Sequence, residues 1–208
     1  MSSATLAAPA ATTPLPAILG PRPLAMRWTV EQFHQMGSMG WFEGRRPFLL
    51  DGVIWEQGPM NPPHANALEL IDIALRAAFG VGWRFRNQTP LTVDDHNDPF
   101  PDYAVVRGTP RDSNTTHPTT AVLIVEVSDT TLQTDLTEKA ERYATAGVTD
   151  YWVVDIVNRE LHVLRDPAPM PAGLGATAYR DQKKFLPTDR VSPLAAPQAS
   201  ILVGDLLP

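Results

Sequence analysis

The fold is decided by a stretch between Pro101 and Asp155, which reads PDYAVV, a polar gap, and then AVLIVEVSDTTLQTDLTEKAERYATAGVTDYWVVD. Its centre is a continuous apolar run with β-branched residues, Ala121 to Val125, which predicts a strand buried on both faces. The run leads directly into Glu126. An unpaired buried carboxylate costs far more than a strand can offset, so Glu126 needs a cation, a hydrogen-bond network or a raised pKa.

Asp102 presents the same problem, because it comes just before the apolar segment Tyr103–Val106. If the two strands are antiparallel neighbours, the start of one and the end of the other meet at the same end of the sheet. Two carboxylates there make an oxygen-rich site that suits Mg²⁺ or Mn²⁺, with the carbonyl of Val127 as a third ligand. The alternative is that each carboxylate caps a strand end or pairs with an arginine.

The chain around this stretch predicts one α/β domain with a mixed sheet and a helix on each face. A helix from about Thr134 to Ala146 separates the buried strand from a strand at Tyr151–Asp155, which indicates a parallel β-α-β crossover. Gly147 fits the end of that helix. The other predicted elements are a helix at 28–36 with Thr29 as N-cap and Gly37 beyond its end, a hairpin from residue 48 that turns at Asp51-Gly52, a helix at 64–79, strands at 83–93, 101–107 and 160–164, a surface loop at 166–175, and short C-terminal strands.

The first 24 of the 208 residues are rich in Ala, Thr and Pro and have no periodic pattern. Such a segment cannot bury enough apolar area to offset its loss of entropy on ordering. We therefore expect a disordered tail at residues 1–24 and a single domain at residues 25–208.

Composition excludes some kinds of site and argues against some partners. The absence of cysteine excludes disulfides, zinc–thiolate sites and a cysteine nucleophile. A formal net charge of −6 disfavours tight non-specific binding to nucleic acid, although it leaves room for a local basic face. No apolar run approaches the roughly 18 residues of a membrane-spanning helix, and no basic segment precedes the N-terminal alanines. We therefore expect a cytoplasmic protein with no membrane partner.

Several of these residues together resemble the Uma-two family, a large bacterial family of candidate endonucleases in the PD-(D/E)XK nuclease superfamily. They are Asp102 in a P-D step, Glu126 in E-V-S, Asp135 and Lys139 on the following helix, and the block AGVTDYWVVD. The resemblance extends from about Leu49 to the C-terminus.

This resemblance implies a restriction-endonuclease-like fold, whose core of helix, three strands, helix and strand is extended here by the N-terminal hairpin and the C-terminal strands. It also implies an endonuclease that uses Mg²⁺ or Mn²⁺ to hydrolyse phosphodiester bonds in nucleic acid, with DNA as the expected substrate. Asp102 and Glu126 would hold the metal. The alternatives are a catalytically inactive member that serves as a binding or regulatory module, and a hydrolase of small phosphodiesters.

The third catalytic position departs from the superfamily pattern. The superfamily places a lysine two residues after the second acid, where this chain has Ser128. The family's usual substitute is a lysine on the following helix, and Lys139 matches it. Asp135 and Lys139 also have the i, i+4 spacing of an ordinary surface ion pair, which is the alternative interpretation.

Two further positions bear on activity. The family typically has a histidine after a Pro-rich turn, and His64 matches that position, where the N-terminus of a helix favours a neutral imidazole. Its alternative role is structural. The family usually carries a glutamate three residues before the Asp-Gly turn, but this chain has Phe48 there, and neither Glu43 nor Glu56 is selected as a substitute.

Arg84 and Arg86 alternate with apolar residues and so share one face of a predicted strand, where they could track a phosphate backbone. A solvated edge strand explains them equally well. Trp152 and Tyr151 are predicted to lie in the core and not to stack on bases. Restriction-like folds commonly dimerise to reach both strands, so a homodimer is expected by analogy.

Overall fold

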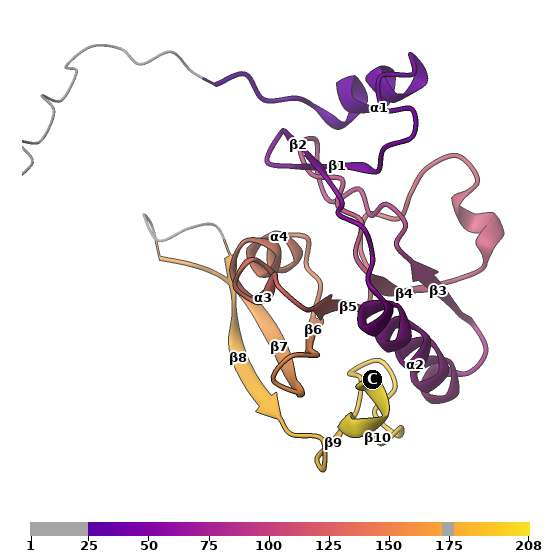
Figure 1. Cartoon of the computed structure of the whole chain (residues 1–208), viewed down its shortest axis with the longest axis vertical. Helices are drawn as coiled ribbons and strands as arrows, with labels where there is room; N and C mark the ends of the chain where they lie inside the picture. The colour runs from indigo at the N-terminus through magenta and orange to yellow at the C-terminus, as the bar shows by residue number, and fades with distance from the viewer. Residues whose placement is uncertain (1–24, 172–176) are drawn as a thin grey trace, which may run out of the picture.

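The computed structural model describes residues 25–171 and 177–208, and the predicted tail at residues 1–24 lies outside these ranges. Its largest element is a six-stranded mixed sheet with the strand order β3-β4-β5-β6-β7-β8 (Figure 1). Strands β5 and β6 are parallel, and every other neighbouring pair in this sheet is antiparallel. The antiparallel pairing that brings Asp102 to Glu126 and the parallel β-α-β crossover are thus both confirmed. The strands are β3 (Trp83–Asn87), β4 (Tyr103–Arg107), β5 (Leu123–Ser128), β6 (Asp150–Asp155), β7 (Glu160–Pro169) and β8 (Thr177–Phe185).

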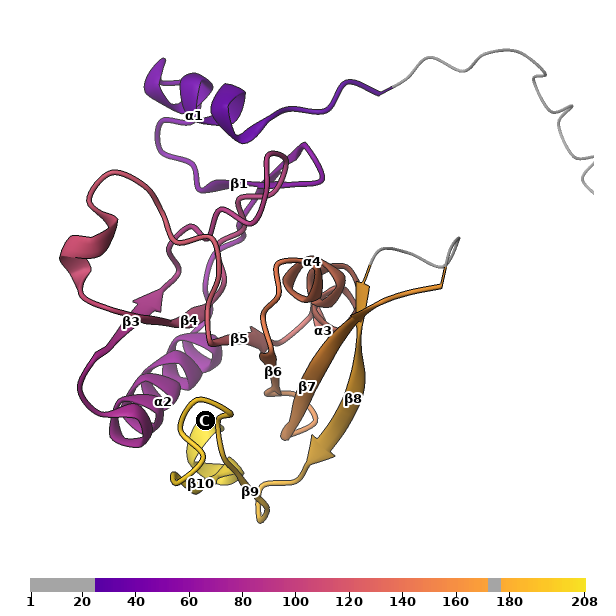
Figure 2. The ribbon, with the colours of Figure 1, turned by 180° about the vertical axis from the view of Figure 1, so that it is seen from behind.

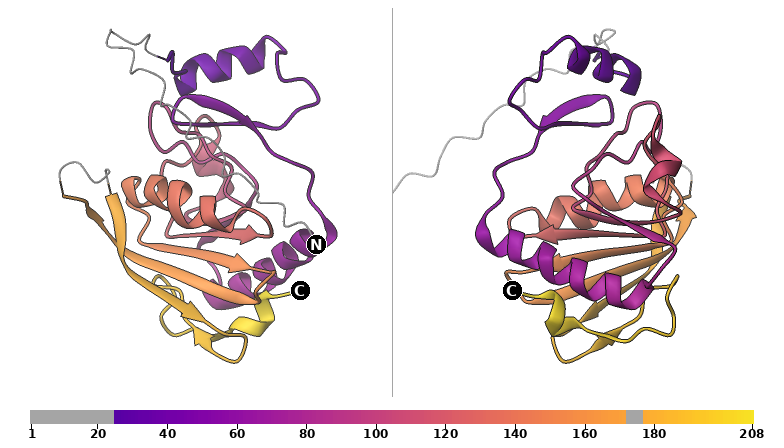
Figure 3. Two further views of the ribbon diagram at one scale, coloured as in Figure 1. Left: turned by 60° about the vertical axis from the view of Figure 1, so that its left-hand side comes forward. Right: turned by 90° about the vertical axis from the view of Figure 1, so that its right-hand side faces the viewer.

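Helices cover the two faces of this sheet, as predicted (Figure 3). Helix α2 (Pro62–Phe79) packs on one face, where Val125 and Val127 of β5 belong to its apolar cluster. The other face is covered by a segment made of α3 (Leu132–Thr134), a π-helical turn η2 (Asp135–Lys139) and α4 (Ala140–Thr145). Because side chains alternate along a strand, Glu126 points to this second face together with Ile124.

The N-terminal elements form a separate small layer (Figures 1 and 2). Helix α1 (Val30–Ser38) begins at the predicted cap Thr29 and packs on the antiparallel hairpin of β1 (Pro47–Leu50) and β2 (Val53–Glu56). The turn Asp51-Gly52 has positive φ at both residues, which confirms the predicted hairpin. The remaining elements are η1 (Pro110–Ser113), β9 (Arg190–Val191), β10 (Ile201–Leu202) and η3 (Val203–Leu206).

Gly52 is required by its surroundings as well as by its backbone conformation. Its φ is +68°, and an added Cβ would lie 2.6 Å from Arg27 Cβ and 2.9 Å from the carbonyl oxygen of Trp28. We expect Gly52→Ala to lower the free energy of unfolding by about 1–3 kcal/mol, measured by urea denaturation. Gly58→Ala is the matched control, since nothing lies within 4 Å of its added Cβ and its φ is not positive. Equal stability of the two variants would contradict this account of the turn.

Several predicted boundaries are wrong. Helix α1 continues through Gly37 to Ser38. Helix α2 begins at Pro62 and not His64, because Asn61 caps it and proline is tolerated in the first turn. Strand β3 ends at Asn87 and does not reach Val93, because Gln88 adopts a positive φ of 44°.

Strand β7 is longer than predicted and takes in the start of the expected loop at 166–175. It pairs with β6 only as far as Arg165, but its pairing with β8 continues to Pro169. A strand that pairs on one side only can include prolines, because the backbone N–H groups on its unpaired edge are not needed for hydrogen bonds within the sheet. The part of this loop at residues 172–176 lies outside the described residues.

Candidate active site

The two carboxylates singled out from the sequence meet at one end of the sheet. Asp102 directly precedes β4 and Glu126 lies in β5; the register pairs Tyr103 with Val125. The backbone N–H of Asp102 donates to Glu126 Oε2 at 3.3 Å, and both residues are buried, with exposed fractions of 5% and 1%. The strand pairing therefore produces the predicted convergence.

Lys139 lies against both Glu126 and Asp135. Its Nζ is 3.1 Å from Glu126 Oε2 and 2.8 Å from Asp135 Oδ1. Only 21% of the lysine side chain is exposed, and the two carboxylate side chains are 1% exposed. The Asp135–Lys139 pair is thus a buried contact with β5 and not an exposed pair on a helix surface.

The π-helical turn directs these two residues inward. The sequence predicts one continuous α-helix from about Thr134 to Ala146, but Asp135–Lys139 forms a π turn between two short α-helical pieces. Thr131 Oγ1 donates to Asp135 Oδ2 at 2.6 Å and fixes that carboxylate. Single π turns inside α-helices occur frequently at functional sites.

Asp102 has partners on both carboxylate oxygens. His64 Nε2 lies 3.2 Å from Asp102 Oδ1, and the backbone N–H of Val127 donates to Asp102 Oδ2 at 2.9 Å. His64 is placed by the start of α2, where its own N–H donates to the side chain of Asn61. The structure thus brings together Asp102, Glu126, Val127, Lys139 and His64. Their roles in metal binding and catalysis remain predictions.

Two supporting side chains were missed by sequence reasoning. Tyr143 is fully buried, and its hydroxyl donates to Glu126 Oε1 at 2.7 Å. The amide of Gln88 donates to Asp102 Oδ1 at 3.3 Å. Tyr143 follows Lys139 by four residues, so helical spacing alone could have placed it on the same face as the lysine.

The electrostatics of the two acids differ. Burial is the main influence on Glu126, and with the nearby charges of Asp102 and Asp135 it outweighs Lys139 and raises the pKa of Glu126 to about 8. Burial opposes the carboxylate of Asp102 too, but His64, Lys139 and the Val127 N–H overcome it and hold the pKa of Asp102 below its ordinary value.

Nearby carboxylates raise the pKa of both basic side chains of the site. Burial disfavours the charged form of Lys139, yet Glu126, Asp135 and Asp102 outweigh it and raise the pKa of the lysine. His64 behaves similarly: burial favours the neutral ring, but Asp102 raises its pKa. The helix N-terminus favours a neutral imidazole, whereas the neighbouring carboxylate of Asp102, which the sequence did not reveal, acts in the opposite direction.

A cavity of about 750 Å³ is lined by His64, Asp102, Val127, Lys139 and Tyr143. The hairpin of β1 and β2 forms one wall, and an ion pair between Asp51 at its turn and Arg142 on α4 ties the two walls together. Phe48, which replaces the glutamate usual in the family, lines the cavity. Glu56 also lines it but is ion-paired with Arg45 at 2.5 Å, and Glu43 is exposed on a turn outside the cavity lining.

Arg84 and Arg86 lie away from this cavity. Arg84 donates to Ser113 Oγ at 2.7 Å, and Arg86 donates to the carbonyl of Pro90 at 2.9 Å. Both are half-buried, and neither lines the cavity. Their role in binding nucleic acid remains a prediction. Trp152 and Tyr151 are fully buried, which confirms their predicted place in the core.

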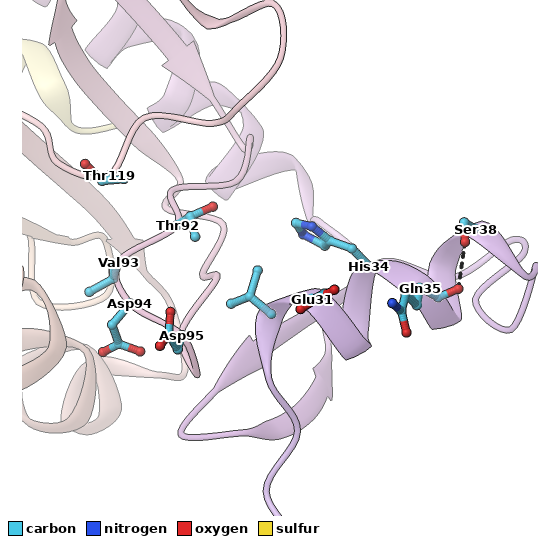
Figure 4. A pocket seen from close by; sticks show the side chains of 10 residues that line it. Glu31, His34, Gln35, Ser38, Thr92, Val93, Asp94, Asp95 and Thr119 are labelled. Carbon is cyan, nitrogen blue, oxygen red and sulfur yellow. Dashed lines mark hydrogen bonds between the residues drawn. The ribbon is translucent and has the colours of Figure 1, made fainter.

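A second hollow, of about 740 Å³, lies between α1 and the segment before β4 (Figure 4). Figure 4 shows Glu31 and His34 on α1 opposite Thr92 and Asp95. Fully buried Asp98 accepts a hydrogen bond from Thr92 Oγ1 at 2.7 Å and is 2.9 Å from His34 Nε2. These contacts join α1 to the segment between β3 and β4 and indicate a structural role.

Among the described residues, Asp155, Glu160 and His162 also gather, with one ligand atom of each within 4.8 Å of the others. Sequence reasoning did not select this group. Asp155 accepts from the backbone N–H groups of Val157 and Asn158 in the turn after β6, at 3.1 and 2.9 Å. Glu160 is ion-paired with Lys184 at 2.8 Å. Both carboxylates therefore already have structural partners.

The mixed sheet, its flanking helices and the paired acids at one strand end define a protein of the restriction-endonuclease-like fold. A crystal structure of a "putative nuclease" from Anabaena variabilis has the same fold, with a TM-score of 0.66, 17% sequence identity, and coverage of 86% of this chain and 96% of that chain. The chain belongs to the Uma2 family, described as "Putative restriction endonuclease", whose sequence profile matches residues 30–203. A comparison with curated proteins finds no match. No helix of the described residues has the length and apolar character needed to cross a membrane.

Proposed function

We propose that the protein is an endonuclease that uses Mg²⁺ or Mn²⁺ to hydrolyse phosphodiester bonds in nucleic acid, with DNA as its expected substrate. The observation that carries this proposal is the convergence of buried Asp102 and Glu126 with Lys139 at the edge of a large cavity. Family membership supports it, because the family is described as "Putative restriction endonuclease".

The donor set fits a hard divalent cation. Asp102 and Glu126 supply oxygen ligands, and the backbone of Val127 lies beside them. The raised pKa of Glu126 also fits, since burial and the neighbouring carboxylates Asp102 and Asp135 disfavour its charge, which a bound cation would favour. When bound, such an ion would polarise a phosphate oxygen and lower the pKa of the attacking water.

The chain's own residues then have distinct tasks. Lys139 is held protonated by three carboxylates, so it can stabilise negative charge that develops on the phosphate. Tyr143 orients Glu126 through its hydroxyl, and His64 orients Asp102 through its ring. Both contacts limit the rotation of the acids, which preorganises the site.

Cleavage assays test this function directly. Supercoiled plasmid, single-stranded oligonucleotides and a chromogenic phosphodiester are incubated with Mg²⁺, Mn²⁺ or EDTA. We expect cleavage of nucleic acid with either metal and none in EDTA. Cleavage of the chromogenic ester alone would assign a small-phosphodiester hydrolase. Binding of nucleic acid without cleavage under any condition would assign a binding module that retains the fold.

A further inference from the structure

The β1–β2 hairpin has two apolar faces, but only one of them is covered. Leu49 and Ile54 form a cross-strand pair that packs on α1. The pairs Phe48–Trp55 and Leu50–Val53 therefore point to the opposite face, and all four of these residues line the cavity that holds Asp102 and Lys139.

This second face is unusually exposed for its composition. Trp55 is 52% exposed and Val53 45%. The part of the cavity wall outside the hairpin adds Met60, Pro99 and Phe100. A contiguous apolar surface left open to water commonly marks a binding site, and here it lies across a cavity from the acidic cluster. The wall thus offers aromatic side chains beside the carboxylate of Asp102 and the ammonium group of Lys139.

The charges that line the cavity do not suit a duplex backbone. The described lining residues include five carboxylates, on Asp51, Glu56, Asp102, Asp129 and Glu138, and three cations, on Arg27, Lys139 and Arg142. Lys139 and Arg142 are ion-paired, and Arg27 donates to the carbonyl of Asp51. Proteins that follow duplex phosphates rely on available lysine and arginine side chains. Stacking on aromatic rings is the alternative source of affinity, and it requires unpaired bases.

We propose that the Phe48–Trp55 face stacks on the base of an unpaired nucleotide, so that the substrate is single-stranded or locally unpaired nucleic acid. The inference rests on the proposed function, in that the phosphate next to the stacked base lies at the Asp102–Glu126 site. Phe48, at the position where the family usually has a glutamate, is thereby a residue that determines substrate class. Trp55 is its cross-strand partner in the same wall.

Binding measurements separate this inference from catalysis. Fluorescence anisotropy with a labelled single strand of about 12 nucleotides is measured in Ca²⁺, with the oligonucleotide checked on a gel for cleavage. We expect the wild type to bind the single strand at least about tenfold more tightly than the same sequence as a duplex. Trp55→Ala should weaken single-strand binding at least about tenfold, and Trp55→Phe should recover most of the loss. Trp41→Ala is the matched control, because Trp41 is 63% exposed but lies outside the cavity lining.

A second binding measurement uses a single strand in which some positions lack the base. The affinity of the wild type for this strand should be as low as the affinity of Trp55→Ala for the intact strand. The inference is overturned if the duplex binds equally well, if Trp55→Ala and Trp41→Ala behave alike, or if Trp55→Ala dissolves a dimer seen by light scattering. If Trp55→Ala cleaves with an unchanged KM, the nuclease function is supported and stacking on the Phe48–Trp55 face is refuted. If binding depends on Trp55 but no variant cleaves, stacking is supported and the nuclease function is refuted.

Discussion

Lys139→Met is expected to reduce nuclease activity at least about a hundredfold while Mn²⁺ still binds. Methionine keeps most of the side-chain length but removes the charge that lies 3.1 Å from Glu126. Preorganised charge beside a reacting phosphate typically supplies roughly 3 kcal/mol of transition-state stabilisation. Activity is measured as kcat on the substrate that the wild type cleaves best, and Mn²⁺ affinity by titration calorimetry. A variant that cuts as fast as wild type would place the lysine outside the chemistry.

The same substitution should also lower stability, by about 3–5 kcal/mol near pH 8, because it leaves buried carboxylates without their cation. The loss should shrink as the pH falls, since protonation of Glu126 removes the uncompensated charge. Lys183→Met is the matched control: Lys183 is ion-paired with Asp181 at 2.9 Å, but its side chain is 64% exposed. An exposed pair contributes at most about 1 kcal/mol, so the control should keep both stability and activity.

Glu126→Gln is expected to abolish detectable cleavage, weaken Mn²⁺ binding more than about tenfold, and remove a pH dependence of folding. The pKa of Glu126 is raised from 4.5 to about 8 in the folded protein. The folded state therefore binds this proton more tightly than the unfolded chain does. Its contribution to stability is fully present below about pH 4.5 and is lost as the pH rises through about 8.

Urea denaturation in EDTA between pH 5 and 9 measures this effect. The free energy of unfolding of the wild type should fall relative to Glu126→Gln by up to about 1.4 kcal/mol per pH unit across the interval. Glu69→Gln, an exposed carboxylate on α2, should follow the wild type at every pH. If the free energies of unfolding of the wild type and Glu126→Gln change in parallel with pH, the pKa of Glu126 is not raised in the metal-free protein.

The sequence was sufficient for the parts of the structure that depend on local patterns. The buried run at Ala121–Val125 and the turn at Asp51-Gly52 each carry a strong local signal, and both elements formed as predicted. The meeting of Asp102 and Glu126 also followed, because antiparallel pairing of β4 and β5 fixes which strand ends lie together. The contact of Lys139 with this site was implied only by family resemblance.

Contacts between distant segments could not be supplied by the sequence. The opposite pKa shifts of Asp102 and Glu126 arise because His64 reaches one acid and Tyr143, Asp135 and Lys139 surround the other. The sequence also could not show which side of the hairpin faces the cavity. Alternation shows that Phe48 and Trp55 share a face, but only the packing of Leu49 on α1 decides which face stays open.

The π turn at Asp135–Lys139 makes the position of the lysine depend on the length of the segment as well as on its composition. A π turn accommodates one residue more than an α-helix of the same rise. Loss of a single residue between Asp135 and Lys139 would let the segment relax into a regular α-helix, while the helical pieces on either side keep their places because the extra residue was accommodated within the turn. Asp135 and Lys139 would then be three positions apart instead of four, which changes the direction of one side chain relative to Glu126. A one-residue deletion would thus test how far these buried ion pairs depend on the length of the turn, with every acidic and basic side chain retained.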